Sequence, residues 1–277
     1  MGPRSSDRGG SSRCFAGRRR APRSPLYLRA QQRRCKGRGL RRLLELELKN
    51  GVLIERVNRF AVRVSTAGRE VLLHNRNTGK LGDLLVPGAE VLYVERRGWE
   101  RRRTSGVLVG VAVTEGDAAL TDPYLQARSF EVAWESDLIS WLSGWKLARR
   151  EVSVMGVRLD YEIASASDGR GYLELKSAVF HDGSGTCMYP DVPSVRGRRH
   201  LMALERLAAK GVRSIVAFVA AHPLCRRFRP CEPCDPELAE LLRRSAERGV
   251  EVRAVSMGLR RDGAVVLLSD DLPVSLA

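Results

Sequence analysis

The sequence has no long apolar run, and this excludes two classes of protein. No stretch of about 18 apolar residues, the length that a membrane-spanning helix needs, occurs along the 277 residues. The first residues also lack the continuous apolar segment of a secretory signal peptide. We therefore expect a soluble, cytoplasmic protein that does not bind membranes.

Acidic residues are scarce at the start of the chain. Residues 1–42 hold thirteen arginines and one lysine against a single acid, Asp7. They account for +13 of the formal net charge of +16, so the rest of the chain contributes only +3. The segment is poor in aliphatic residues and cannot offset its own ordering entropy. We predict that residues 1–45 form a disordered basic extension. A non-specific arm for anionic polymers is one interpretation; we favour a solvated extension or an upstream start codon that the native protein does not use.

Cysteine is too sparse for the disulfide framework of a small secreted domain, with six residues in the whole chain. Cys231 and Cys234 have CxxC spacing, and Cys187 or Cys225 could complete a zinc site. A second CxxC pair is missing, however. A redox pair and a stabilising disulfide stay open, and unlinked loop thiols are the expectation.

Helical periodicity is nearly absent between residues 46 and 120. Short apolar stretches with the alternation typical of strands are separated by glycine-containing turns. The segment predicts a small, mostly antiparallel barrel of about five strands. Aromatic residues make up only 6% of the chain, and here only Phe60, Tyr93 and Trp99 could stack on bases. The barrel is therefore weak evidence for binding of RNA or a repair intermediate.

The pattern changes after Thr121. Asp122-Pro123 predicts a helix start, and apolar residues at helical spacing extend this helix to 146–150. The elements expected after it are strands at 151–155, 157–164 and 171–179, a helix at 194–210, a strand at 212–221, a helix at 235–249, a strand at 250–256 and a C-terminal hairpin. This order predicts a mixed α/β sheet with its apolar parallel strands inside.

A group of residues in this half suits phosphodiester chemistry. If the strands on either side of the Asp168-Gly169 reversal pair with each other, Asp160 lies near Glu174 and Lys176. Two carboxylates suit Mg²⁺ or Mn²⁺, which can activate a water and neutralise charge on a scissile phosphate. A nearby lysine can orient that water. We therefore predict Asp160, Glu174 and Lys176 as catalytic residues, with the two acids as metal ligands.

The tetrapeptide LELK occurs twice, at 46–49 and at 173–176. The first copy has no upstream strand carrying an aspartate, so we expect only a solvated ion pair on one strand face. Asp160 and the surrounding helices and strands distinguish the second copy.

A basic helix start follows this group. Asp191 precedes the helix at 194–210, and Arg196, Arg199 and His200 lie in its first turns. Basic groups and free N–H groups at a helix start can bind an anion. A basic solvated helix face explains the same residues equally well.

Several spaced motifs in one order resemble the sugar fermentation stimulation protein A (SfsA) family over residues 46–276. The matching segments are NRF at 58–60, HNRNTGKL at 74–81, RRT at 102–104, VRLDY at 157–161, ELKS at 174–177 and YPDVPSVRGRRHL at 189–201. The resemblance implies an N-terminal OB-like β-barrel at 46–120, followed at 121–277 by a restriction-endonuclease-like PD-(D/E)xK domain. Asp160, Glu174 and Lys176 match the nuclease triad.

The resemblance also implies that DNA is the partner. The residues that we predict to bind nucleic acid are Asn77, Arg102, Arg103, Arg158, Asp191, Arg196, Arg199 and His200. The chain departs from the family pattern at Val132, where many members carry a glutamate. Glu131, Glu135 or Asp137 could supply the missing oxygen, and we take Glu135 as the third metal ligand.

Two functions follow as hypotheses. The first is a DNA-binding protein with a nuclease-like domain that depends on Mg²⁺ or Mn²⁺. The alternative is a regulator of sugar-utilisation genes that binds DNA without cutting it. The sequence leaves open whether the protein forms a homodimer.

Overall fold

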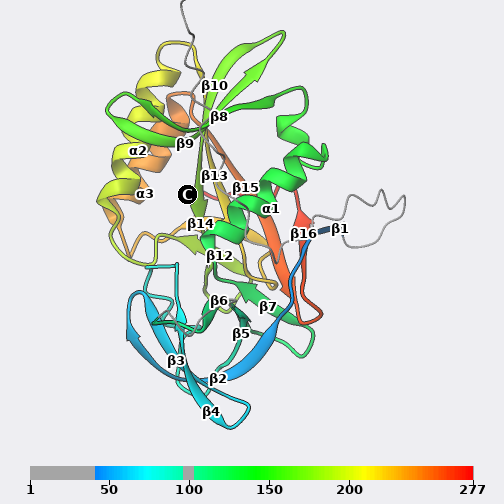
Figure 1. The fold of residues 1–277 in the computed structure, drawn as a ribbon. Coiled ribbons are helices and arrows are strands. Elements are labelled where there is room, and N and C mark those ends of the chain that lie inside the picture. Colours follow the sequence, from blue (N-terminus) through cyan, green and yellow to red (C-terminus); the bar gives the residue numbers. More distant parts are fainter. Residues whose placement is uncertain (1–40, 96–102, 277) are drawn as a thin grey trace, which may run out of the picture.

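The computed structural model describes residues 41–95 and 103–276. A β-barrel lies at one end of the molecule and a layered α/β region at the other (Figure 1). The predictions for residues 1–40, Trp99 and Arg102 lie outside the described residues. Among the described helices, none is long and apolar enough to cross a membrane.

The barrel has five strands. They are β2 (Lys49–Asn58), β3 (Ala61–Thr66), β4 (Arg69–His74), β5 (Glu90–Glu95) and β6 (Gly106–Ala112). Strands β4, β3, β2, β5 and β6 pair antiparallel in this order, and a parallel β4–β6 pairing closes the barrel. Gly106 is required at the closure, because a Cβ there would lie 2.6 Å from the Val94 carbonyl oxygen. The closed, mostly antiparallel barrel confirms the prediction.

A mixed sheet forms the centre of the α/β region. Its order is β7 (Asp117–Leu120), β15 (Glu251–Arg260), β13 (Arg213–Ala220), β10 (Gly169–Ser177), β9 (Val157–Ser165) and β8 (Lys146–Val154). Strand β13 is parallel to β10 and β15, and the other neighbours in this row are antiparallel. Because β7 also pairs with β6 of the barrel, the two parts share one continuous sheet.

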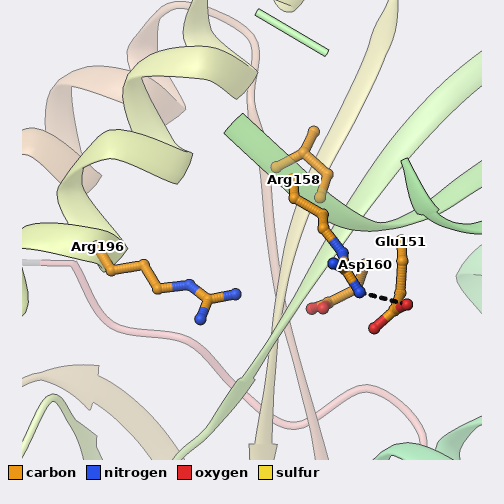
Figure 2. A pocket seen from close by; sticks show the side chains of 5 residues that line it. Glu151, Arg158, Asp160 and Arg196 are labelled. Atoms are coloured by element: carbon orange, nitrogen blue, oxygen red, sulfur yellow. Dashed lines mark ion pairs between the residues drawn. The ribbon is translucent and has the colours of Figure 1, made fainter. Parts of the chain in front are cut away.

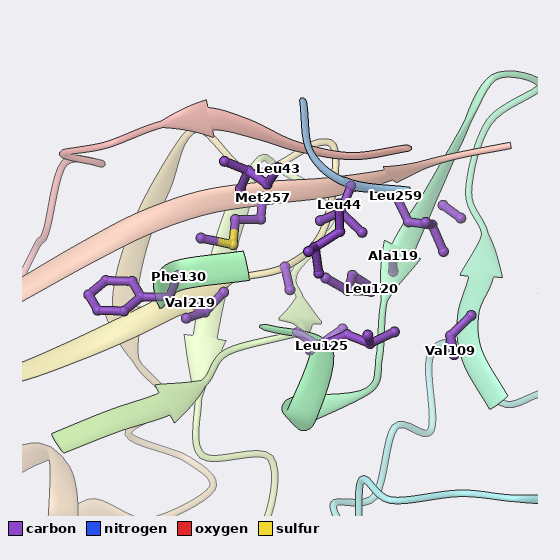
Figure 3. Close-up of a cluster of buried hydrophobic side chains, with 14 of the residues drawn as sticks. Leu43, Leu44, Val109, Ala119, Leu120, Leu125, Phe130, Val219, Met257 and Leu259 are labelled. Atoms are coloured by element: carbon purple, nitrogen blue, oxygen red, sulfur yellow. The ribbon is translucent and has the colours of Figure 1, made fainter. Parts of the chain in front are cut away.

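Helices cover both faces of this sheet. Helix α1 (Pro123–Glu135) lies on one face, and α2 (Val195–Ala208) and α3 (Pro236–Glu247) lie on the other (Figure 1). Alternate residues of β13 divide accordingly, with Val219 in the cluster beneath α1 and Phe218 in the cluster beneath α2 and α3. The first cluster continues through Leu120 to Val109 of the barrel (Figure 3). The barrel and the α/β region therefore share part of their core.

Two predictions about element boundaries are wrong. Helix α1 ends at Glu135, not at 146–150, and a 3₁₀ turn at Ser140–Leu142 leads into β8. The chain leaves the helix through Asp137, which has a positive φ of 56°. The residues of the predicted extension at 41–45 form β1 (Arg41–Glu45), which pairs with β16 (Ala264–Ser269). Leu43 and Leu44 are buried in the core, and this burial explains why the last residues of the segment are ordered.

A second, three-stranded sheet was not predicted. It contains β11 (Phe180–His181), β12 (Thr186–Tyr189) and β14 (Arg227–Pro230). Disulfides join Cys187 to Cys225 and Cys231 to Cys234. The expectation of unlinked thiols is therefore wrong, since the fold of this small sheet brings the cysteines together in pairs.

Candidate functional site

Asp160 and Glu174 lie where strands β9 and β10 separate. The antiparallel pairs run from Ser165 opposite Gly169 to Tyr161 opposite Leu173, as the predicted reversal requires. At the next position, Asp160 and Glu174, the strands no longer form backbone-to-backbone hydrogen bonds, and side chains accept hydrogen bonds from the backbone amides instead.

The two carboxylates make reciprocal bonds across this gap. The amide N of Leu175 donates to Asp160 Oδ2 at 2.8 Å, and the amide N of Asp160 donates to Glu174 Oε2 at 3.2 Å. The backbone of each strand thus holds the carboxylate of the other, and this fixes the two acids beside each other.

Glu174 is the buried centre of the group. Its side chain is 3% exposed, and Lys176 Nζ donates to its Oε1 at 2.6 Å. His200 Nδ1 contacts the same oxygen, and the Lys176 and His200 nitrogens lie 3.4 Å apart. A lysine and a histidine therefore converge on one carboxylate oxygen.

The two acids differ in their electrostatic surroundings. Burial and the neighbouring Glu174 charge raise the pKa of Asp160 from 3.8 to about 6. Burial also raises the pKa of Glu174, but the hydrogen bond from His200 and the charge of Lys176 outweigh it and hold the pKa below its usual value. Glu174 therefore stays ionised, while Asp160 titrates close to neutral pH.

A polar pocket opens at Asp160. Its volume is about 290 Å³, and the residues that line it are Glu151, Arg158, Leu159, Asp160 and Arg196. Arg158 forms an ion pair with Glu151, and Arg196 reaches toward them from α2 (Figure 2). The pocket thus brings together Asp160 and two of the arginines that the sequence predicts to contact nucleic acid.

His200, which the sequence predicts as a nucleic-acid ligand, is a packed residue beside Glu174. It is 4% exposed and contacts Glu174, not the surface. Ser194 caps α2 by accepting from the Gly197 amide at 3.1 Å, which sets the helix start. His200 then falls on the buried helix face between Gly197 and Leu204. His200 follows Gly197 by three residues and precedes Leu204 by four, which places all three on one helix face. This spacing in the sequence could have predicted that His200 is buried.

Asn77 and Asp191 join the barrel to the α/β region. Asn77 Nδ2 donates to the Thr121 carbonyl oxygen at 3.1 Å. Asp191 Oδ2 accepts from the Leu81 amide at 3.0 Å, and a Cβ at Gly79 would lie 2.5 Å from this oxygen. Both predicted nucleic-acid ligands therefore bind the protein's own backbone at this junction.

The remaining predicted residues that the structure describes do not line the pocket. Glu135 is exposed at the end of α1, with Arg128 as an ion-pair partner at 3.8 Å. Its neighbour Glu131 is buried and accepts from Arg150 at 2.8 Å. Arg103 and Arg199 are exposed.

The donor set at the strand separation suits a hard cation. Asp160 and Glu174 supply carboxylate oxygens, and Mg²⁺ or Mn²⁺ needs few protein ligands because it keeps several waters. Within residues 41–95 and 103–276, no cluster of three or more His, Cys, Asp or Glu side chains is arranged to hold a metal ion. An ion here would depend on the two acids and on water.

Comparison with known proteins identifies the family. The model described as "SfsA N-terminal OB domain" matches residues 54–119, and the model described as "Sugar fermentation stimulation protein RE domain" matches residues 124–263, about half of the chain. The chain belongs to the sugar fermentation stimulation protein family. The resemblance seen in the sequence is confirmed, as are the mixed α/β class and the N-terminal OB domain.

Members of this family from archaea resemble the chain over most of its length. The sugar fermentation stimulation protein homolog of Archaeoglobus fulgidus is 40% identical over 231 residues, which are 82% of this chain and 97% of the relative. The Pyrococcus furiosus homolog is 36% identical over 217 residues, 78% of this chain and 91% of the relative. The solved structure of Pyrococcus furiosus SfsA in complex with Ca²⁺ superimposes with a TM-score of 0.79 at 35% identity, covering 84% of this chain and 99% of that one.

Proposed function

We propose that this protein binds DNA and that its C-terminal region hydrolyses phosphodiester bonds with Mg²⁺ or Mn²⁺. The observation that carries the proposal is the reciprocal bonding of Asp160 and Glu174 at the strand separation, with Lys176 on Glu174 and a pocket with two arginines beside Asp160. Acids on two adjacent strands and a lysine two residues after the second acid are the arrangement of a PD-(D/E)xK nuclease.

Asp160 and Glu174 would hold the divalent ion. When bound, such an ion lowers the pKa of a water and stabilises the charge that develops on the phosphoryl oxygens. The elevated pKa of Asp160, about 6, still leaves this ligand ionised above neutral pH. The lowered pKa of Glu174 keeps the second ligand ionised as well.

The other side chains would bind and orient the substrate. Lys176 extends its ammonium group to Glu174 from a side chain that is 11% exposed, so it can hold the attacking water or stabilise negative charge next to the acids. His200 contacts the same Glu174 oxygen as Lys176 and would help to orient this carboxylate. Arg158 and Arg196 line the pocket, where guanidinium groups suit phosphate oxygens.

The family supports the choice of cation and of partner. The relative from Pyrococcus furiosus binds Ca²⁺, a divalent ion that also takes oxygen ligands. The OB domain supports the assignment of a nucleic acid as the partner, because folds of this class bind oligonucleotides. The same substrate requires a compartment that contains DNA, in keeping with the expected cytoplasmic location.

One observation favours DNA binding without cleavage. Glu174 Oε1 contacts both Lys176 and His200, and its Oε2 accepts from the Asp160 amide. A metal ion would have to share these oxygens with three protein donors. If it cannot, the protein would bind DNA through its arginines as a regulator.

Cleavage assays separate the two functions. The purified protein is incubated with labelled single-stranded and duplex DNA in Mn²⁺ and, in parallel, in EDTA. We expect cleavage in Mn²⁺ only, and we expect Lys176→Ala to reduce its rate at least a hundredfold, the scale of a lost acid–base or charge-stabilising group. Lys210→Ala, at an exposed position, is the matched control. Equal rates for Lys176→Ala and the parent would remove the catalytic assignment. Salt-sensitive binding of DNA that stays intact would support the regulator.

A further inference from the structure

The pocket at Asp160 contains an ion pair between Arg158 and Glu151, and Glu151 has no role in the proposed chemistry. Arg158 extends over Asp160 to Glu151, and Arg196 points toward the same space from α2 (Figure 2). The side chains of Arg158 and Glu151 are 58% and 67% exposed. Solvent therefore reaches both partners, and an anion from solution could reach Arg158.

Glu151 lies opposite Asp160 and has an unusual backbone conformation. The flanking pairs, Arg150 with Tyr161 and Val152 with Leu159, put Glu151 opposite Asp160 across the β8–β9 ladder. Its φ is 55°, in the left-handed region that residues other than glycine rarely adopt. Met155 in the same hairpin also has a positive φ, but it lies in the turn, where this conformation is common. Strained residues within regular elements concentrate at functional sites.

The ion pair holds Arg158 next to the acids of the site. The hydrogen bond and charge of Glu151, with a smaller contribution from Asp160, raise the pKa of Arg158. The negative charges of Asp160 and Glu151 would repel a phosphodiester that enters the pocket. The positive charge of Arg158 would not attract it fully, because Glu151 already neutralises that charge. The Arg158 guanidinium could release Glu151 and bind two phosphate oxygens in a forked geometry. Such a bidentate, charge-assisted pair with phosphate is stronger than an exposed ion pair with a carboxylate.

We propose that Glu151 is a competing internal anion: Arg158 exchanges the Glu151 carboxylate for a phosphate of the substrate, and Glu151 thereby sets the affinity and selectivity of the pocket for polyanions. The inference rests on the proposed function, since it requires a phosphodiester ligand. Exposed ion pairs are weak enough to be exchanged at each binding event. A free monoanion gains too little from Arg158 alone to displace Glu151, whereas a nucleic acid also contacts Arg196.

The test is a double-mutant cycle on DNA affinity without metal. The anisotropy of a short labelled duplex is measured in EDTA with the parent, Glu151→Gln, Arg158→Met and the combined variant. Glu240→Gln is the matched control, because Glu240 forms a similar exposed pair with Arg243 on α3 and its side chain is 68% exposed. We expect Glu151→Gln to bind about fivefold more tightly than the parent, the scale of an exposed ion pair. The control should be unchanged, and the gain should disappear in the Arg158→Met background.

Other results would overturn the inference. If Glu151→Gln gains as much affinity in the Arg158→Met background as in the parent, its charge acts by general repulsion and no exchange occurs. If Glu151→Gln binds DNA no better than the parent and also loses affinity for Mn²⁺ in a calorimetric titration, Glu151 is a metal ligand. A parent protein with no measurable affinity for duplex or single-stranded DNA would refute the proposed function itself. If the parent does bind DNA and Glu151→Gln leaves that affinity unchanged, only the exchange at Arg158 is refuted and the proposed function stands.

Discussion

The charge of Asp160 destabilises the fold, and replacing this residue by asparagine should reveal by how much. The folded protein raises the pKa of this carboxyl from 3.8 to about 6, mainly through burial and then through repulsion by Glu174. The folded state therefore binds this proton more tightly than the unfolded state. Stability consequently falls as the pH rises through the window from about 4 to 6, and the full penalty is present at pH 7.

The pKa difference gives the magnitude. A change from 3.8 to about 6 corresponds to about 3 kcal/mol of unfolding free energy at neutral pH. Asp160→Asn removes the charge and keeps an oxygen that can accept from the Leu175 amide. We expect the variant to be more stable than the parent by about 1 kcal/mol at pH 4.5 and by about 3 kcal/mol at pH 7. The same variant should lose Mn²⁺ binding and cleavage, as expected where a functional group opposes stability.

Urea denaturation of both proteins at pH 4.5 and pH 7 measures this difference. Asp271→Asn is the control, because Asp271 is exposed with only a loose ion pair to Arg253 at 3.6 Å. The reasoning is refuted if Asp160→Asn is no more stable than the parent at pH 7, or if its advantage is the same at both pH values. Calorimetric titration with Mn²⁺ on the same samples reports whether the loss of function accompanies the gain of stability.

Three further predictions concern regions outside the pocket. Burial and the adjacent His181 lower the pKa of His222 to about 4, so the unfolded state takes up this proton first and stability falls by about 2 kcal/mol from pH 7 to pH 5. His222→Gln should reduce this acid dependence in urea melts, and an unchanged pH slope would contradict it. The Cys187–Cys225 disulfide closes a loop of 38 residues, so changing both cysteines to serine should lower the unfolding free energy by about 4 kcal/mol in denaturant titrations. A decrease in unfolding free energy of less than about 1 kcal/mol would contradict the estimate from the loop-closure entropy of the unfolded chain. Asp191→Ala should destabilise the protein by about 1–3 kcal/mol through the lost bond from the Leu81 amide, with DNA affinity unchanged in anisotropy measurements. Weaker DNA binding with unchanged stability would restore Asp191 as a nucleic-acid ligand.

The sequence was sufficient to predict the hairpin that carries the acids. Tight-turn chemistry at Asp168-Gly169 and two strands of matching length fix the register, and register alone determines which side chains face each other. The proximity of Asp160, Glu174 and Lys176 follows from these local rules. The barrel was predictable for the same reason, because strand alternation and turn glycines are local signals.

Other features depend on contacts that local patterns do not encode. The apolar residues after Glu135 continue at helical spacing, yet Trp134 donates to the Trp145 carbonyl oxygen across a chain reversal. Both tryptophans are buried by tertiary packing, which overrides the helical pattern. The place of Glu151 beside Asp160 likewise depends on the β8–β9 register, and its left-handed φ of 55° inside a strand is one that no propensity predicts.

The two LELK segments show why the neighbours of an ExK triplet determine its chemistry. In the first copy, Glu47 is exposed and Lys49 pairs with Glu95 on β5, so water and salt screen each charge. In the second copy, Glu174 is buried, and its carboxylate must be satisfied by donors that the protein supplies. Lys176 is then held on Glu174, and burial, together with the charge of Glu174, raises the pKa of Asp160. The electrostatics of the second copy therefore arise from burial in a sheet that helices cover on both faces. Residues 46–48 of the first copy lie between β1 and β2, where Glu47 is exposed, and lack that burial.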